Sequence, residues 1–364
     1  MTGHVLKPQT ARFYKIADLL NTLKIDALLI SSTPNVSYCA GFFAPDSYMV
    51  ITKNKAVIIT DSRYVSDFAR KIELPFAIKE YKSSVFKTIV RTLKQTAVKE
   101  AGFESRHLTF AECEILCSLG SKHIKFIPLK ETIEPLREIK ECGEIETIKK
   151  TIAITLKAFA FIEKKLKPGA RELEIAAHLE RFIRLQGATS SAFDIIVASG
   201  PNSSYPHAGI SSRVMQKGEA VIIDMGVAYN GYKCDLTRTW FLGKIKPIAQ
   251  KAYRIVSEAQ QRAIKAIRPG VTAKSIDSAA RNYIAEKGFG EFFGHSLGHG
   301  VGLEVHESPS INKKNHRIIN ANMVFTVEPG IYIPGEFGIR IEDMVLVNNS
   351  GTEVLSGAYS DKSD

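Results

Sequence analysis

Apolar residues over about the first 130 positions alternate between a helical spacing and short runs of strand length. The helical spacing covers residues 11–24, and an apolar run follows at residues 26–31. Two further runs, at residues 47–52 and 56–60, predict strands, and the alternation continues to residue 129. Strands and helices that alternate along a chain are typical of a sheet covered by helices. The pattern therefore predicts an N-terminal α/β domain.

A charged segment that contains a proline, residues 131–141, separates this pattern from a second one. Longer helical patterns follow, and the first of them runs from Glu144 to a stop signal before Lys167-Pro168-Gly169. A chain of 364 residues is long enough for two domains. We therefore expect one domain over residues 1–133 and a second over residues 134–364.

The second domain contains a weak internal repeat. Lys167-Pro168-Gly169 recurs as Arg268-Pro269-Gly270, at an offset of 101 residues (268 minus 167). At this offset Ile175 matches Ile276, Phe182 matches Tyr283, Ile183 matches Ile284 and Gly187 matches Gly288. A duplicated helix-helix-strand unit explains these matches, and chance similarity of two amphipathic helices is the alternative. A duplication would allow one site to be shared by two pseudo-symmetric halves.

The strongest local signal is a β-hairpin centred on Asn230-Gly231. This pair between apolar and β-branched residues is typical of a type I′ turn, which needs a positive φ at both positions. Counting outward from the turn pairs Asp224 with Thr237 and places Asp235 on the same face of the hairpin. The two aspartates are then diagonal neighbours, about 7 to 8 Å apart at Cα, and can hold a cation between them. A solvated hairpin face is the alternative.

Three later stretches add side chains that could bind metal. Residues 294–307 (GHSLGHGVGLEVHE) carry three histidines among glycines, Glu328 ends an apolar run, and Arg340 and Glu342 share one face of a strand. The candidate ligands are Asp224, Asp235, His299, Glu328 and Glu342. This oxygen-rich set suits Mn²⁺, with Co²⁺, Zn²⁺ or Fe²⁺ as alternatives, and exceeds the needs of one tetrahedral Zn²⁺. Two divalent ions that share bridging carboxylates would use all five ligands.

A two-ion centre of this kind predicts hydrolysis. It can lower the pKa of a bridging water from 15.7 towards about 7 and polarise a carbonyl at the same time. The sequence contains no GxSxG motif, no Walker A loop and no cysteine in a frame typical of a nucleophile. A loop rich in glycine, proline and serine carries His207, which could donate to a substrate carbonyl or oxyanion. An ordinary loop histidine is the alternative.

The ligands, in their order and with the segments HSLGHGVGLEVHE, VEPGIY and IRIED around them, resemble those of the pita-bread metallopeptidases. That family includes methionine aminopeptidase, aminopeptidase P and prolidase. The resemblance covers about residues 140–350, and the preceding α/β domain resembles the N-terminal domain of the proline-specific branch. It implies an α+β pita-bread (creatinase/aminopeptidase-like) C-terminal domain. The implied activity removes the N-terminal residue from small peptides with proline second, by attack of a metal-bridging hydroxide, and relatives are commonly homodimers.

The resemblance also implies a role for each metal ligand. Asp224 and Glu342 are expected to bridge the two ions. Asp235 is expected mainly on one ion, and His299 and Glu328 on the other. Glu328 is further expected to take the proton of the nucleophile.

Five other side chains receive roles that support the reaction. By the same resemblance, His207 and His306 stabilise the tetrahedral intermediate and shuttle a proton. His295 approaches the proline side of the substrate, and Arg340 orients the centre from outside the ligand set. Thr237, on the same hairpin face as the aspartates, is expected to support them in the same way.

The length of the substrate stays open. A dipeptidase must bind the free carboxylate of the proline, for which arginine is best suited. Prolidase-like relatives often have a basic residue soon after the VHE motif, whereas here none occurs between Glu307 and Lys313. Two other functions are a catalytically inactive pita-bread binding module and a creatinase-like hydrolase, and the complete ligand set argues against both.

Composition narrows the remaining classes. The chain has 49 basic and 38 acidic residues and a formal net charge of +11, but its basic residues form no long run and alternate with no aromatic residues. We therefore expect no nucleic-acid partner. Five cysteines without a CxxC pair indicate a reduced compartment. With no signal-like segment and no run of 18 apolar residues, we expect a cytoplasmic protein that is not membrane-bound.

Overall fold

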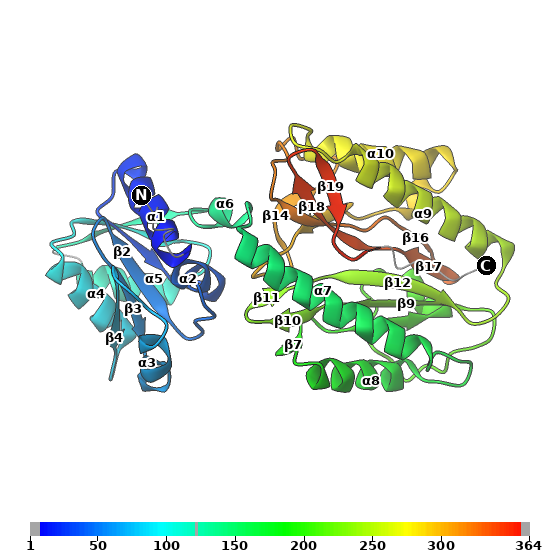
Figure 1. Ribbon diagram of the computed structural model, residues 1–364, viewed down its shortest axis with the longest axis horizontal. Coiled ribbons are helices and arrows are strands. Elements are labelled where there is room, and N and C mark those ends of the chain that lie inside the picture. The colour runs from blue at the N-terminus through cyan, green and yellow to red at the C-terminus, as the bar shows by residue number, and fades with distance from the viewer. Residues whose placement is uncertain (1–7, 121–122, 358–364) are drawn as a thin grey trace, which may run out of the picture. The chain divides into compact units, whose positions relative to one another are not determined.

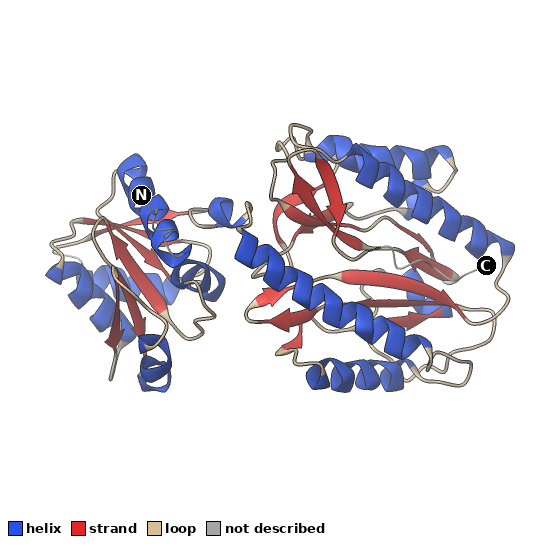
Figure 2. Cartoon of the chain, in the orientation of Figure 1, coloured by secondary structure: helices blue, strands red, loops and turns tan. Residues whose placement is uncertain are grey.

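The computed structural model describes residues 8–120 and 123–357, and the chain divides into two compact units. The units are Met1–Arg137 and Glu138–Asp364, so the division falls four residues after position 133 (137 minus 133). Each unit has buried apolar clusters of its own. Figures 1 and 2 show the helices and strands of both units. None of the described helices is long and apolar enough to cross a membrane.

The first unit is an α/β domain built on one six-stranded sheet, as the alternating pattern predicted. The strand order is β4-β3-β2-β1-β5-β6, with β1 antiparallel to β2 and parallel to β5. The strands are β1 (Ala27–Ile30), β2 (Tyr48–Thr52), β3 (Ala56–Thr60), β4 (Phe76–Glu80), β5 (Glu100–Glu104) and β6 (Lys125–Leu129). The helices are α1 (Pro8–Leu23), α2 (Thr33–Ala40), α3 (Ser62–Ala69), α4 (Val85–Gln95), α5 (Phe110–Gly120) and α6 (Glu134–Arg137).

Helix α2 was not predicted from the sequence. It is short, and the two residues just before its first turn are held by a residue far away in the chain. The backbone N–H groups of Ser31 and Ser32 donate to the Glu104 carboxylate at 2.6 and 2.9 Å. A carboxylate at a helix N-terminus satisfies backbone N–H groups that have no partner within the helix. Because this partner comes from the end of β5, no local pattern could reveal the helix.

The second unit packs two pairs of helices against several small sheets. In Figure 1, α7 and α8 lie on one side of the strands, and α9 and α10 lie on the other. Each pair forms a buried apolar cluster with the strands next to it. The helices are α7 (Cys142–Glu163), α8 (Glu172–Leu185), α9 (Pro247–Ala266) and α10 (Ala273–Glu286), with short 3-10 turns η1 (Gly200–Ser204) and η2 (Gly290–Phe292).

Four sheets of this unit supply the strands around the candidate site. Their orders are β12-β9-β8, β11-β10-β7, β14-β13-β15-β18-β19 and β16-β17. The strands of the first half are β7 (Ser190–Ser191), β8 (Ile196–Ser199), β9 (Ala220–Met225), β10 (Val227–Tyr229), β11 (Tyr232–Lys233) and β12 (Leu236–Phe241). Those of the second half are β13 (Gly298–Gly300), β14 (Glu307–Ile311), β15 (Val324–Val327), β16 (Gly330–Ile333), β17 (Phe337–Arg340), β18 (Asp343–Asn348) and β19 (Gly351–Val354).

The structure supports the internal duplication. Both ends of α8 and α10 are offset by 101 residues (273 minus 172, and 286 minus 185). The glycines before the two helices, Gly169 and Gly270, have φ of 92° and 90°, and those after them, Gly187 and Gly288, have φ of 92° and 86°. Each helix is also preceded by an isolated antiparallel bridge. The matched residues therefore occupy equivalent places in two similar units.

The predicted hairpin is confirmed with its register. Tyr229 pairs with Tyr232 across the turn, and further along Asp224 pairs with Thr237. The turn residues Asn230 and Gly231 have φ of 50° and 84°, as a type I′ turn requires. The turn sequence thus determined which hairpin residues share a face.

Candidate metal centre

Three carboxylates from different strands converge on one point. Asp224 lies in β9, Asp235 just before β12, and Glu342 between β17 and β18, and each offers an oxygen within 4.8 Å of the other two. Asp224 Oδ1, Asp235 Oδ1 and Glu342 Oε1 are buried and accept no hydrogen bond from any described residue. Buried carboxylate oxygens normally accept hydrogen bonds. Three such oxygens side by side fit the coordination of a divalent cation.

The electrostatics of these carboxylates also favour a cation. Burial, together with the charges of neighbouring carboxylates, raises the pKa of Asp235 well above its ordinary value. The pKa of Glu342 is raised well above its ordinary value for the same two reasons. A proton on each group, or a divalent ion between them, would relieve this repulsion.

A second group of ligands lies beside the first. His299 of β13 and Glu328, which directly follows β15, form with Glu342 a set whose ligand atoms lie within 4.8 Å of one another. His299 Nε2 is 3.3 Å from Glu328 Oε1 and 3.6 Å from Asp235 Oδ2. His299 Nδ1 is 3.2 Å from the Gly300 carbonyl oxygen, which favours the proton on Nδ1 and leaves Nε2 free to bind metal. The structure thus brings together all five predicted ligands.

Arg340 and Thr237 hold two of the carboxylates from outside the ligand set. Arg340 donates to Asp224 Oδ2 at 2.7 Å and to the Thr237 hydroxyl at 3.1 Å. Thr237 in turn donates to Glu342 Oε2 at 2.7 Å. These contacts occupy one oxygen of each carboxylate and turn the other toward the centre. Both residues therefore contact ligand side chains, and the supporting role predicted for them stays a prediction.

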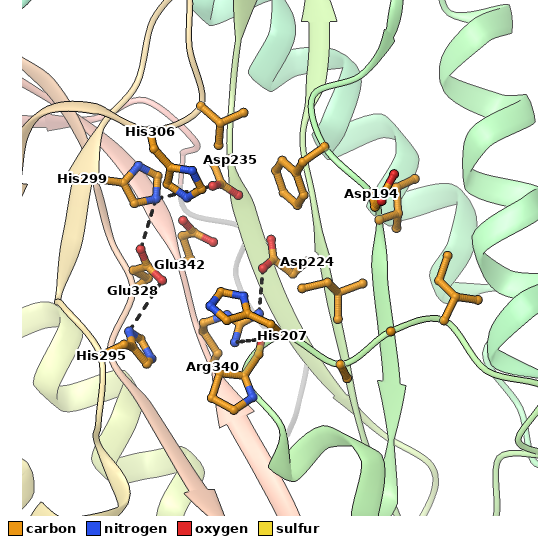
Figure 3. A pocket seen from close by; sticks show the side chains of 18 of the residues that line it. Asp194, His207, Asp224, Asp235, His295, His299, His306, Glu328, Arg340 and Glu342 are labelled. Carbon is orange, nitrogen blue, oxygen red and sulfur yellow. Dashed lines mark hydrogen bonds and ion pairs between the residues drawn. The ribbon is translucent and has the colours of Figure 1, made fainter. Parts of the chain in front are cut away.

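The three remaining histidines line the same cavity as the ligands. This cavity has a volume of about 760 Å³. Figure 3 shows His295, His306 and His207 around the carboxylates, with Asp194 on the far wall. The ring centroids of His306 and His299 are 4.3 Å apart, and His295 Nε2 is 3.0 Å from the Tyr332 hydroxyl. His207 is exposed, on the loop that follows η1.

Comparison with known proteins identifies the family of this centre. The sequence profile of metallopeptidase family M24 matches residues 146–349, and the profile of the creatinase/prolidase N-terminal domain matches residues 12–139. The chain belongs to metallopeptidase family M24. The architecture is accordingly a creatinase-type N-terminal α/β domain followed by a pita-bread domain, which confirms the predicted fold class.

The relatives of this M24 metallopeptidase include two kinds of proline-specific enzyme. An Xaa-Pro dipeptidase from Pyrococcus horikoshii is 38% identical over 346 residues, which cover 94% of this chain and 95% of the relative. The structure of an Xaa-Pro dipeptidase from Bacillus anthracis has a TM-score of 0.92 and 36% identity, over 96% of this chain and 98% of the other. The structure of an X-Pro aminopeptidase from Thermotoga maritima has a TM-score of 0.86 and 40% identity, over 93% of this chain and 97% of the other.

The glycines around His299 in the M24 domain have a packing role. A Cβ at Gly298 would lie 1.9 Å from the Thr326 carbonyl oxygen, and a Cβ at Gly300 would lie 2.2 Å from that of Ser308. Strand β13 is therefore squeezed between β14 and β15, and only glycine fits on either side of the histidine. The glycines place His299 by letting three backbones approach closely.

Tyr332 is a functional candidate that the sequence analysis missed. Its hydroxyl accepts a hydrogen bond from Arg340 at 2.7 Å and lies 3.0 Å from His295 Nε2, so it connects the residue that holds Asp224 to a histidine of the cavity. A Cβ at Gly330 would lie 2.5 Å from this hydroxyl, so the ring folds back over that glycine. The alternation Glu328, Gly330, Tyr332 along the chain is a signal that could have placed Tyr332 near the centre.

Proposed function

We propose that this M24 metallopeptidase is an Xaa-Pro peptidase that holds two divalent ions and removes the N-terminal residue before a proline. The observation that carries the proposal is the convergence of three buried carboxylate oxygens without a hydrogen-bond partner among the described residues, next to His299 and Glu328. The dipeptidase and aminopeptidase relatives supply the substrate class by similarity.

The distances between ligand atoms indicate which carboxylates could be shared by the two proposed ions. Glu342 belongs both to the group with Asp224 and Asp235 and to the group with His299 and Glu328. Asp235 also belongs to a group that contains His299, whereas Asp224 has one oxygen engaged by Arg340. We therefore assign the shared positions to Glu342 and Asp235. The resemblance had given the second of these to Asp224, and the distances favour Asp235.

When bound, divalent ions at these ligands lower the pKa of water and polarise a substrate carbonyl. Glu328 is placed to take a proton. In the metal-free protein, burial acts to raise its pKa, but the hydrogen bond from a protonated His299 and the charge of that ring lower it below the ordinary value. Its carboxylate is therefore ionised at neutral pH and can accept a proton at an oxygen that faces the cavity.

The cavity histidines are suited to hold a substrate carbonyl. Burial lowers the pKa of His295 and of His306, so both rings are neutral at neutral pH. His295 donates its one N–H, on Nδ1, to the Ser296 carbonyl oxygen at 2.7 Å, so His306 is the ring with an N–H left for a substrate carbonyl. His306, beside His299, is assigned together with His207 to the developing oxyanion. His295, on the opposite side of Glu328 from His299, is assigned to the proline side of the substrate.

Longer peptides are proposed as substrates in addition to dipeptides. Among the described residues that line the cavity, Arg340 is the only arginine or lysine. Its guanidinium already donates to Asp224, Thr237, Tyr332 and the Pro206 carbonyl oxygen. No free cation is therefore in place among these residues to bind the carboxylate of an Xaa-Pro dipeptide.

The test compares peptides and metals directly. The protein is loaded with Mn²⁺, Co²⁺ or Zn²⁺ and supplied with Xaa-Pro, Xaa-Pro-Yaa and Xaa-Ala-Yaa peptides. We expect release of the first residue from the proline peptides, with higher kcat/KM for Xaa-Pro-Yaa than for Xaa-Pro. Absence of release with every metal would reject the proposal and favour an inactive binding module.

Three further expectations stay proposals beside this one. Manganese as the metal is tested by analysis of the purified protein before any metal is added. A homodimer is tested by light scattering, and a cytoplasmic location by cell fractionation. A different bound metal, a monomer or a membrane-associated fraction would contradict the respective expectation.

A further inference from the structure

A fully buried carboxylate holds the loop that carries His207. Glu172, at the start of α8, has no exposed surface. Its Oε1 accepts hydrogen bonds from the Ser199 N–H and the Ser199 hydroxyl, both at 2.7 Å. Its Oε2 accepts from the Asn202 side chain at 3.1 Å and from the Ser211 hydroxyl at 2.5 Å. All these donors belong to residues 199–211, so one carboxylate anchors both ends of the His207 loop.

The hydrogen-bond donors around Glu172 require both of its carboxylate oxygens to act as acceptors. The Ser211 hydroxyl already accepts hydrogen bonds from the Asn202 amide and the Arg213 N–H, so its own proton must go to Glu172. The Ser199 hydroxyl accepts from the Arg213 guanidinium at 2.6 Å and likewise gives its proton to Glu172. Both oxygens of residue 172 must therefore be acceptors. A glutamine would place an amide donor against other donors.

The other half of the domain uses a buried carboxylate in the same way. Asp277 of α10 is also fully buried, and it accepts two hydrogen bonds of 2.7 Å from the Arg281 guanidinium. Arg281 donates in turn to the Phe293 carbonyl oxygen at 2.9 Å and to the His295 carbonyl oxygen at 2.7 Å. The planar guanidinium thus connects the buried acid to the segment that carries His295.

We propose that Glu172 and the Asp277–Arg281 pair are positioning residues, one in each half of the pseudo-symmetric domain, for His207 and His295. The acids are not at equivalent positions of the repeat, because the offset of 101 places Glu172 on Ala273 and Asp277 on Ala176. What the halves share is the arrangement: a buried carboxylate on the second helix orders the histidine-bearing segment. This inference rests on the substrate roles proposed for the two histidines.

The arrangement matters most for His207, because the His295 ring is also held by the Ser296 carbonyl oxygen and the Tyr332 hydroxyl. His207 is exposed, and the contact next to it is made by the Pro206 carbonyl oxygen, which accepts from Arg340 at 3.2 Å. The position of its ring therefore depends on the backbone of its loop. A displacement of about 1 Å in a catalytic group can lower a rate by about 100-fold.

Double-mutant cycles separate positioning from general stability. Glu172→Gln is expected to lower kcat by about tenfold or more, with KM changed less than about twofold. In a His207→Ala background the same change should have no further effect, whereas in a His295→Ala background it should keep its full effect. A fall in kcat that persists without His207 would overturn the proposal.

The second half is tested by Arg281→Lys, which removes the planar guanidinium that spans Asp277 and the two carbonyl oxygens. We expect KM for Xaa-Pro-Yaa peptides to rise by about tenfold with little change in kcat. The rise should vanish in a His295→Ala background and persist in a His207→Ala background. The opposite pattern would contradict the assignment.

Matched controls make the same substitutions at exposed residues of the same type. Glu174→Gln changes an exposed carboxylate on α8, and Arg262→Lys changes an exposed arginine paired with Glu258 on α9. Both should keep the kinetic constants of the parent chain. Asn202→Ala, at a half-buried position, replaces Glu172→Gln if that variant fails to fold, and it should give a smaller effect with the same dependence on His207.

Hydrogen exchange distinguishes failure of this inference from failure of the proposed function. If the parent chain cleaves no Xaa-Pro peptide, the proposed function fails, and backbone order is then measured in the metal-free protein. Glu172→Gln should speed amide exchange in residues 203–211 only, and Arg281→Lys in residues 293–297 only. Unchanged exchange in the corresponding segment would overturn the positioning role by itself.

Discussion

Each of the three converging carboxylates is a source of instability in the metal-free fold. Asp235 and Glu342 are buried, and both lie next to other acids, so an ionised form of either is unfavourable. Arg340 donates a hydrogen bond to one oxygen of Asp224, and Thr237 donates to one oxygen of Glu342. The other oxygen of each carboxylate accepts no hydrogen bond from a described residue. Such a cluster is tolerated where the binding of an ion stabilises the fold by more than the repulsion between the carboxylates destabilises it.

The first prediction at this scale concerns Asp235→Asn. The change removes one buried negative charge and one ligand, so we expect a higher melting temperature of the metal-free protein and a loss of the stabilisation by Mn²⁺. Activity should fall by about 100-fold or more. Thermal denaturation with EDTA and with Mn²⁺, together with peptide hydrolysis, measures both effects. Asp194→Asn, an exposed aspartate of the same cavity, is the control and should behave like the parent chain.

The second prediction concerns pH. Because the pKa values of Asp235 and Glu342 are raised well above the ordinary values, the metal-free folded state keeps protons that the unfolded chain releases above about pH 4. Its free energy of unfolding therefore falls as the pH rises toward the folded-state pKa values. A divalent ion replaces these protons. The increase in melting temperature on adding Mn²⁺ should thus be larger at pH 8 than at pH 5.5, and an equal increase at both would contradict the assignment.

At the scale of elements, the hairpin shows what a local pattern can determine. The turn at Asn230-Gly231 set the register, and alternation then placed Asp224 and Asp235 on one face, as the structure has them. Helix α2 is short and escaped prediction because the residues that lead into it, Ser31 and Ser32, are held by Glu104 from another strand. Tyr332 was missed because its importance comes from Arg340 and His295, which reach it from separate segments.

A glycine in the hairpin gives the third prediction. A Cβ at Gly226 would lie 1.7 Å from the Cys234 carbonyl oxygen, between the strands that carry the two aspartates. Gly226→Ala should destabilise the fold by about 1 to 3 kcal/mol and weaken Mn²⁺ binding, because the strands must separate there. Urea unfolding and calorimetric titration measure the two effects. Gly351→Ala, a strand glycine with no described atom near its Cβ position, is the control. Unchanged Mn²⁺ affinity in Gly226→Ala would contradict the argument.

At the scale of the whole molecule, the chain consists of two units with separate apolar cores. Met1–Arg137 has a buried cluster of its own, and Glu138–Asp364 has a cluster for each helix pair of the duplicated domain. The candidate ligands come from both halves of the second unit: Asp224 and Asp235 from the first, and His299, Glu328 and Glu342 from the second. The centre therefore forms only when the two halves pack together.

The fourth prediction follows from this distribution. Differential scanning calorimetry should show two unfolding transitions, of which only that of the second unit shifts upward with Mn²⁺. At a free ion concentration 100 times the dissociation constant, the gain in unfolding free energy is about 2.7 kcal/mol. The Asp235→Asn variant should lack the shift. One transition that moves as a whole would show that the two units unfold together.

The sequence by itself determined the kinds of ligand, the register of the hairpin and the alternation of elements in the first unit. Each of these follows from rules that act over a few residues: the φ values of a turn, the alternation of side chains in a strand and the spacing of apolar residues. Asp224 and Glu342 are 118 residues apart in sequence (342 minus 224). Only the tertiary structure decided that a carboxylate oxygen of one lies within 4.8 Å of a carboxylate oxygen of the other. It also decided that Glu172 and Asp277 hold the histidine loops, because these contacts depend on how the helices pack against the sheets.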